Sequence, residues 1–196
     1  FWNERYAAEG YAYGETPNGL LVESRAHLPT AGRALCLAEG EGRNAVWLAE
    51  QGLRVTAVDI AEQGMAKARA LAARRGVEIE TRVCDLGEFD PGLACWDLIV
   101  SVFAHLPPRV RAEVHARCVR ALAPGGVFLY IGYAPEQLGK GTGGPKEAAL
   151  LPDIADIEAE LAGLTCVHRA HGPRQIAEGR FHTGEGWVNE WIGRKP

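Results

Sequence analysis

The stretch that decides the fold is ALCLAEGEGRNAVWLAE, residues 34–50. Its apolar start, residues 34–38, is typical of a buried strand, and residues 44–50 have the spacing of a helix. The turn Gly40-Glu41-Gly42 joins the two. Because glycine has no Cβ, the chain can turn sharply here, and a ligand can lie against the backbone at the helix N-terminus. Strand, glycine turn and helix form the opening unit of a nucleotide-binding α/β domain.

Length and composition favour one globular domain spanning residues 1–196. The chain has 47% hydrophobic and 23% charged residues, with a formal net charge of -4. A weakly acidic chain without a basic stripe argues against a nucleic acid partner. No apolar run has the length of a membrane span, and no signal-like start is present, although the chain begins at Phe1 rather than at methionine. We therefore expect a cytoplasmic protein with no membrane partner.

Neither the cysteines nor the histidines show the spacing of a metal site. His168 and His171 differ by an odd number, so on a strand they face opposite sides. No C-x-x-C pair occurs, and the odd number of cysteines favours reduced thiols over a disulfide framework. We expect no metal, and buried thiols at Cys36, Cys84, Cys95, Cys118 and Cys166.

The rest of the chain alternates strand-like and helix-like segments. The pattern predicts further strands at 54–60, 78–84, 96–102, 127–133, 165–169 and 187–192. It predicts helices at 1–10, 20–28, 61–75, 108–122 and 153–161, and a connection at 172–186. This alternation is typical of an α/β, Rossmann-like sheet of seven strands, mostly parallel, with helices on both faces.

Polar residues follow four successive strands, where ligands bind in such sheets. They are Glu39, Asp59, Asp85 and the segment 101–105. A carboxylate at Asp59, nineteen residues after Gly40, can accept both hydroxyls of a ribose, or it can cap the next helix. Asp85 can accept from the exocyclic amine of adenine, or it is a turn acid.

The glycine turn alone leaves two cofactor classes open. Gly40-x-Gly42-x-x-Ala45 also fits the dinucleotide fingerprint, so an NAD(P)-dependent oxidoreductase is an alternative. Two features argue against it. The chain is short for a cofactor domain plus a substrate domain, and it ends in helix, strand, strand.

Seven blocks, in order, resemble the class I S-adenosylmethionine (SAM)-dependent methyltransferases, and among them the small tellurite-resistance and thiopurine-type branch. The blocks are WNERYAAEGYAYGETPN, LAEGEGRNAVWLAEQG, VTAVDI, CDL, WDLIVSVFAHLPP, LAPGGVFL and GTGGP. The resemblance covers nearly the whole chain and implies an antiparallel last strand. It also implies methyl transfer to a small-molecule acceptor such as a thiol or a selenium or tellurium oxyanion, by a monomer or weak homodimer. A non-catalytic SAM-binding protein remains a further alternative.

The resemblance assigns cofactor contacts position by position. The glycine turn should hold the methionine part of SAM, Asp59 the ribose, and Ile60 the adenine face. The remaining implied contacts are Asn44 at the helix start, Asp85 and Leu86 at the adenine edge, and Ser101, Val102, Phe103 and His105 beside the cofactor. Residues 1–30 should form a cap that closes over the cofactor through Trp2, Tyr6, Tyr13 and Asn18.

The first strand departs from the family pattern at two positions. Cys36 stands where the family has an acid, and Ala38 stands where it has a glycine. Glu39 supplies a carboxylate nearby, and we expect it to contact the amino group of the cofactor. Glu41, which lies within the glycine turn, is a further expected contact to the methionine part.

Two residues are candidates for the transfer step. His105 is a candidate base or orienting group, or else a structural histidine, and Tyr133 either faces the acceptor or belongs to the core. An anionic acceptor would need a cation, for which Lys140, Arg174 and Arg180 are candidates. The glycine-rich loop 139–144 is expected to be a lid over the acceptor.

Overall fold

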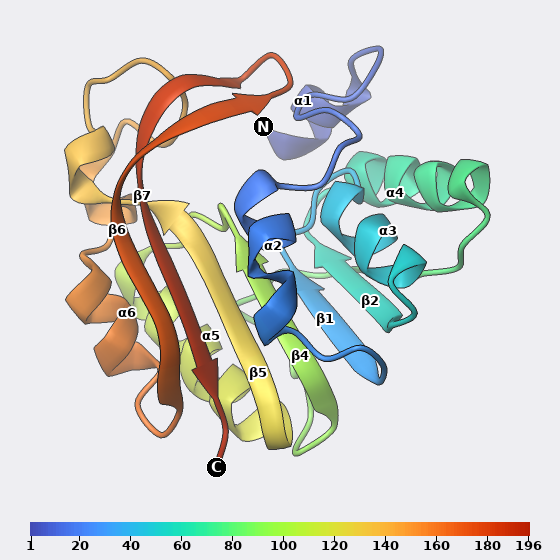
Figure 1. Cartoon of the computed structure of the whole chain (residues 1–196). Coiled ribbons are helices and arrows are strands. Elements are labelled where there is room, and N and C mark those ends of the chain that lie inside the picture. Colours follow the sequence, from blue (N-terminus) through green and yellow to red (C-terminus); the bar gives the residue numbers. More distant parts are fainter.

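The computed structural model describes residues 1–196 and contains one seven-stranded sheet between two layers of helices (Figure 1). The strands are β1 (Arg33–Leu37), β2 (Arg54–Asp59), β3 (Glu80–Val83), β4 (Trp96–Val102), β5 (Leu122–Tyr133), β6 (Thr165–Glu178) and β7 (His182–Arg194). The α-helices are α1 (Trp2–Ala7), α2 (Gly19–Glu23), α3 (Arg43–Glu50), α4 (Glu62–Arg75), α5 (Pro108–Ala121) and α6 (Ile154–Glu160). Short 3-10 helices are η1 (Ser24–His27), η2 (Pro135–Gln137) and η3 (Ala148–Leu150).

The strand order is β3-β2-β1-β4-β5-β7-β6. The first five strands pair in parallel, and β7 runs antiparallel to both β5 and β6. The predicted fold class is therefore confirmed, including the reversed last strand. The chain leaves β1 toward β2 on one side and returns to β4 on the other, so a crevice forms outside the carboxyl ends of β1 and β4.

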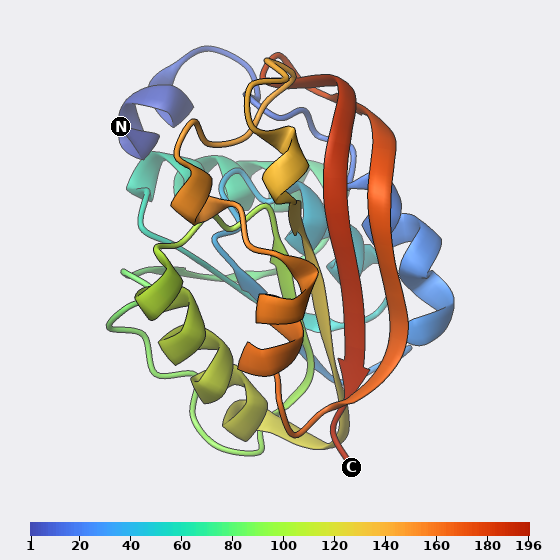
Figure 2. The ribbon, with the colours of Figure 1, turned by 90° about the vertical axis from the view of Figure 1, so that its left-hand side faces the viewer.

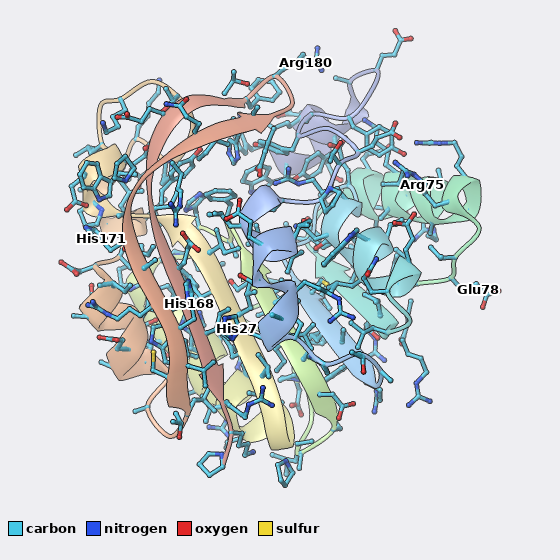
Figure 3. The ribbon with its side chains drawn as sticks, in the orientation of Figure 1. His27, Arg75, Glu78, His168, His171 and Arg180 are labelled. Carbon is cyan, nitrogen blue, oxygen red and sulfur yellow. The ribbon has the colours of Figure 1, made fainter.

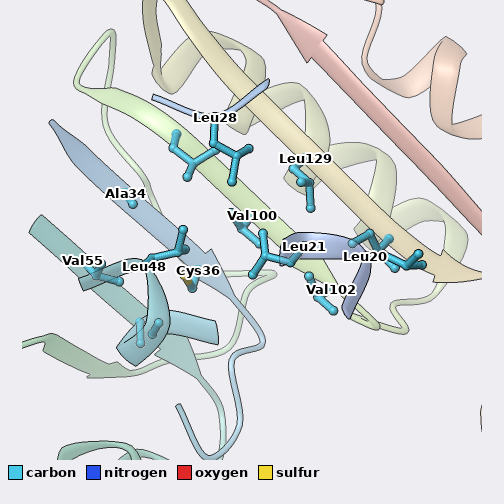
Figure 4. Packing of buried hydrophobic residues seen from close by; sticks show 14 of the residues in the cluster. Leu20, Leu21, Leu28, Ala34, Cys36, Leu48, Val55, Val100, Val102 and Leu129 are labelled. Carbon is cyan, nitrogen blue, oxygen red and sulfur yellow. The ribbon is translucent and has the colours of Figure 1, made fainter. Parts of the chain in front are cut away.

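The alternation of side chains along each strand divides the core into two layers. Leu98, Val100 and Val102 of β4 pack beneath α2 and α3 (Figure 4). Ile99, between them, packs on the opposite face with Val114 of α5. Figure 2 shows α5 and α6 on that face of the sheet. This period of two is what a strand buried on both sides requires. No helix combines the length and the apolarity needed to cross a membrane.

The C-terminal hairpin is longer than predicted. The structure replaces the expected connection at 172–186 with continuous pairing that runs out to Glu178 and His182. Only Gly179, Arg180 and Phe181 turn the chain, and the hairpin bends over the carboxyl-end rim of the sheet (Figure 1). The glycines and the proline of residues 172–186 are typical of a loop, so the sequence pattern did not predict that this segment continues the two strands of the hairpin.

Two strands end in residues with left-handed backbone conformations. Ala38 after β1 has φ 48°, and Phe103 after β4 has φ 53°. Such conformations are unfavourable for residues that carry a Cβ, and they concentrate at functional sites. Ala38 occupies the position at which the family pattern has glycine, so the structure shows a steric reason for that glycine.

We predict that Ala38→Gly stabilises the protein by about 1 kcal/mol, because it relieves the left-handed strain by more than it adds to the freedom of the unfolded chain. For a chain of this size the melting temperature should rise by roughly 2–4 °C. Ala34→Gly, at a fully buried position within β1, is the matched control. It should lower the melting temperature, because glycine in a strand loses more conformational freedom on folding than alanine does. Equal losses in both variants would show that Ala38 is not strained.

Candidate active site

Two buried carboxylates hold the glycine turn in shape. Oε1 of Glu39 accepts hydrogen bonds from the backbone N–H groups of Asn44 (2.9 Å) and Ala45 (2.8 Å) at the start of α3. Oδ2 of Asp59 accepts from the N–H of Gly40 (2.8 Å), and its Oδ1 accepts from the N–H of Ala61 (2.8 Å). The capping alternative for Asp59 is thus realised. An ionised carboxylate has about four lone-pair sites, so both groups can accept further hydrogen bonds.

Burial raises the pKa of both carboxyls. The pKa of Glu39 rises from 4.5 to about 7 because desolvation outweighs the hydrogen bonds from Ala45 and Asn44 and the charge of Arg43. The pKa of Asp59 is also raised by burial. The Cys36 thiol, fully buried beside Glu39, has a raised pKa because of burial and of the Glu39 charge. Cys36 is therefore a neutral thiol and does not replace the acid of the family pattern.

We predict a pH-dependent stability difference between Glu39→Gln and the wild type. The folded state binds the Glu39 proton more tightly than the unfolded state, so this residue's contribution to stability falls as pH rises from 4.5 to about 7. Glutamine can accept the same hydrogen bonds without ionising. Relative to wild type, the variant should gain up to about 3 kcal/mol across that window.

Denaturant unfolding at several pH values measures this difference. The exposed Glu88→Gln is the control. A difference between Glu39→Gln and wild type that does not change with pH would contradict the raised pKa.

The N-terminal segment lies directly over the glycine turn. The Tyr6 ring covers Gly40 so closely that a Cβ there would lie 2.7 Å from the tyrosine hydroxyl oxygen. Trp2 stacks on Tyr6, with ring centroids 5.8 Å apart. Oε2 of Glu41 accepts from the N–H of Ala12 (2.7 Å), and its Oε1 pairs with Lys67 of α4 (2.9 Å). Glu41 thus anchors the N-terminal segment through both of its carboxylate oxygens, and its role as a cofactor contact stays a prediction.

A second junction joins this segment to α3 and the hairpin. Glu178 of β6 accepts from the Asn18 side chain (2.6 Å) and from the Arg43 guanidinium (2.6 Å). The Asn44 side chain accepts from the backbone N–H of Asn18 (2.9 Å). The N–H of Arg180 donates to the carbonyl of Ala12 (3.1 Å). The predicted residues Asn18 and Asn44 therefore hold the cap in place.

Aromatic rings fill the rim above β4 and β5. Phe103 lies 4.6 Å from Tyr133 and 4.9 Å from His182, centroid to centroid, and His105 stacks on Tyr133 at 5.8 Å. Tyr13 joins the cluster at 4.6 Å from His182. Three buried polar atoms in it have no hydrogen-bond partner: His105 Nε2, Tyr133 Oη and His182 Nδ1, the last of which lies 3.8 Å from Oε2 of Glu178. Buried atoms of this kind are rare in folded proteins and indicate a place for a ligand or water.

Burial also sets the protonation states in this cluster. The pKa of His105 falls to about 4, mainly by desolvation and partly through the nearby His182. The pKa of Tyr133 is raised by burial. At neutral pH His105 is therefore an uncharged ring that can accept a proton or a hydrogen bond, and Tyr133 is a neutral hydroxyl.

The other predicted cofactor contacts differ in exposure. Ile60 is 53% exposed next to the buried Asp59, so an apolar side chain faces outward beside the carboxylate. Leu86, Ser101 and Val102 are buried in the walls behind the rim. Asp85 is exposed and accepts from the N–H of Gly87 (2.8 Å), which realises the turn-acid alternative and leaves one of its oxygens free.

The candidate cations are either paired or exposed at the tip of the hairpin. Lys140 pairs with Glu185 (3.3 Å) and Arg174 with Glu190 (2.8 Å). Figure 3 shows Arg180 at the hairpin tip. The loop 139–144 packs onto Tyr133, since a Cβ at Gly143 would lie 2.8 Å from its hydroxyl oxygen.

The remaining histidines and the cysteines lie apart from the aromatic cluster on separate elements. His168 stacks near His27, whereas His171 bonds to Asn189, so the two histidines face opposite sides of the hairpin (Figure 3). No group of three or more His, Cys, Asp or Glu side chains is placed to hold a metal. All five cysteines are free, but only Cys36 and Cys118 are buried. Cys84 and Cys95 are half-buried and Cys166 is exposed on the edge strand β6, so the expectation of burial is wrong for these three.

Sequence reasoning assigned no role in the site to Glu178, His182 or Lys67. Glu178 lies 135 residues from Arg43 and 160 from Asn18, and its role depends on where the hairpin bends. Neither local periodicity nor a motif signals such a contact. The spacing Glu178-x-x-x-His182 is the one local sign, since a short turn brings both residues to the same end of the hairpin.

Comparison with known proteins agrees with this geometry. Residues 34–126 match the family model described as "Methyltransferase domain". No curated protein sequence matches the chain. Three solved structures share its fold at low sequence identity.

The first belongs to work on the "Conversion of a Disulfide Bond into a Thioacetal Group during Echinomycin Biosynthesis". It has a TM-score of 0.76 and 17% identity, over 98% of this chain and 87% of that one. The structure of TehB from Haemophilus influenzae has a TM-score of 0.75 and 16% identity, over 100% of this chain and 66% of that one. A SAM-dependent methyltransferase from Methanosarcina mazei has a TM-score of 0.72 and 15% identity, over 87% of this chain and 95% of that one.

The matched residues begin in β1 and end at Gly126 of β5, so they include the glycine turn, Asp59 and the end of β4. The solved structures extend the likeness, as fold, to nearly the whole chain. The family-model match supports a methyltransferase domain over residues 34–126. The solved structures, all below 20% identity, show that the chain shares their fold.

Proposed function

We propose that the protein transfers the methyl group of SAM to a small-molecule acceptor at the rim above β1, β2 and β4. The observation that carries this proposal is the shape of the glycine turn. Glu39 and Asp59 fix its backbone by hydrogen bonds, and the turn leads directly into the N-terminus of α3. The residues fit the cofactor. Asp59 retains acceptor capacity for a ribose, and the exposed Ile60 beside it offers an apolar face to an adenine. Bound SAM supplies an electrophilic methyl group on a sulfonium.

The chain's own residues position the reactants. Gly40 and Gly42 would hold the methionine part, Asp85 and Leu86 the adenine edge, and Ser101, Val102 and Phe103 the wall beside the methyl group. Residues 1–30 would cap the site within the single domain, with Trp2 and Tyr6 excluding water. His105 and Tyr133 offer one acceptor and one donor to the incoming molecule, and this pair orients the acceptor. The sequence blocks support the thiopurine and tellurite branch but do not distinguish an uncharged from an anionic acceptor, and TehB shares the fold.

Calorimetric titration with SAM and, separately, with NADH tests the cofactor. We expect SAM to bind and Asp59→Asn to weaken binding about tenfold or more, because charge-assisted hydrogen bonds to the ribose are lost. Asp90→Asn, an exposed turn acid, is the matched control and should bind SAM as wild type does. Binding of NADH instead of SAM would favour the oxidoreductase alternative.

The Glu39 contact to the cofactor's amino group has its own signature. An ammonium placed beside Glu39 lowers the carboxyl pKa from about 7, so at about pH 6.5 SAM binding should release a proton. The observed binding enthalpy will then depend on the ionisation enthalpy of the buffer. In Glu39→Gln this dependence should disappear. If the variant and the wild type release the same number of protons, Glu39 is not the partner of the amino group.

A further inference from the structure

A cavity of about 340 Å³ lies between α2, the N-terminal loop and β6. Figure 1 shows α2 and the bent end of the hairpin, which flank it. The volume is at the lower end of the range for small-molecule sites. The Phe103 ring lines the cavity and continues into the cluster with Tyr133, 4.6 Å away. Arg43, the residue after the glycine turn, also lines it, so the cavity adjoins both parts of the proposed active site.

The arginines of the cavity are already paired. Nη2 of Arg43 lies 2.6 Å from Oε2 of Glu178, and both side chains are about one-tenth exposed. Nη2 of Arg174 lies 2.8 Å from Oε1 of Glu190. The remaining charged side chain of the lining is the exposed Glu23, which has no ion pair. An entering anion therefore finds no unpaired cation and one unpaired carboxylate.

Both the ion pairs and the apolar lining of the cavity favour an uncharged ligand over an anion. An anion would lose its hydration and would have to displace a carboxylate from a guanidinium, and both steps are unfavourable. An uncharged molecule leaves both ion pairs intact and gains contact with the side chains of Leu20, Phe103 and Ile176. The candidate cations Lys140 and Arg180 do not line the cavity.

We propose that this cavity binds the methyl acceptor, that the acceptor is an uncharged small molecule with an apolar face, and that Glu178 and Glu190 set this selectivity by neutralising Arg43 and Arg174. The identification of the ligand as a methyl acceptor rests on the proposed function. The charge selectivity of the cavity rests on the ion pairs alone. Selenium and tellurium oxyanions are thereby excluded as preferred acceptors.

Benzamide and benzoate test this selectivity, because they have nearly the same shape and differ in charge. Their binding is followed by chemical-shift titration of the isotope-labelled protein without cofactor, with the amides of Phe103 and Ile176 as reporters. Wild type should bind benzamide at least about tenfold more tightly than benzoate. Glu178→Gln and Glu190→Gln each leave one guanidinium without its carboxylate, so each should raise the affinity for benzoate about tenfold or more. Glu185→Gln, which releases Lys140 outside the cavity, is the matched control and should change neither affinity.

Three results would overturn the proposal. The first is binding of benzoate by the wild type as tight as that of benzamide, and the second is the absence of reporter shifts with benzamide. The third is an unchanged preference for benzamide in both glutamine variants. Glu190→Gln keeps the test valid if Glu178→Gln does not fold, because Glu178 also holds Asn18. Failure to bind SAM would overturn the methyltransferase proposal but would not alter this titration, which contains no cofactor.

Discussion

The structure depends on the way in which two buried carboxylates hold four backbone N–H groups around the glycine turn. Glu39 binds the first turn of α3, and Asp59 joins the turn to the end of β2. Buried backbone groups need partners, and a glycine-rich turn cannot supply them from its own side chains. The carboxylates therefore fix the path of the chain exactly where a ligand would meet the backbone. The burial that makes these bonds strong also raises the pKa of both carboxyls.

The other elements of the site are arranged around this turn. Glu41 faces away from it and, through Lys67 and the N–H of Ala12, holds the N-terminal segment against α4. Tyr6 then covers Gly40, so the structure shows the glycine turn closed by the protein's own aromatic side chain. A cofactor that reaches the turn must displace Tyr6. In the proposed function, the segment that covers the bound cofactor must therefore also open to admit it.

The sequence predicted the sheet well because its signals are local. The run WDLIVSV has apolar residues on both faces, which favours a strand between two helical layers, and the structure places it next to β1. Asp59 was found because it ends a buried strand at a definite spacing from Gly40. The sequence could not separate its two roles, since capping and ribose binding use the same carboxylate.

Contacts between distant segments were not predictable in this way. The charge balance of the cavity depends on Glu178 meeting Arg43 across 135 residues. Arg174 was a candidate for an anion site until the structure placed it on Glu190. Glu41 has the right position in the motif but points its side chain toward Ala12. In each case the residue type was correct for binding, and the fold determined which partner it met.

A crystal structure of the protein with S-adenosylhomocysteine tests the central claim most directly. The account predicts the ligand across Gly40 and Gly42, with its ribose hydroxyls on Asp59 and its amino group near Glu39, and with the Tyr6 ring displaced from Gly40. A ligand that lies elsewhere, for instance in the cavity beside Arg174, with Tyr6 still on the turn, would contradict it.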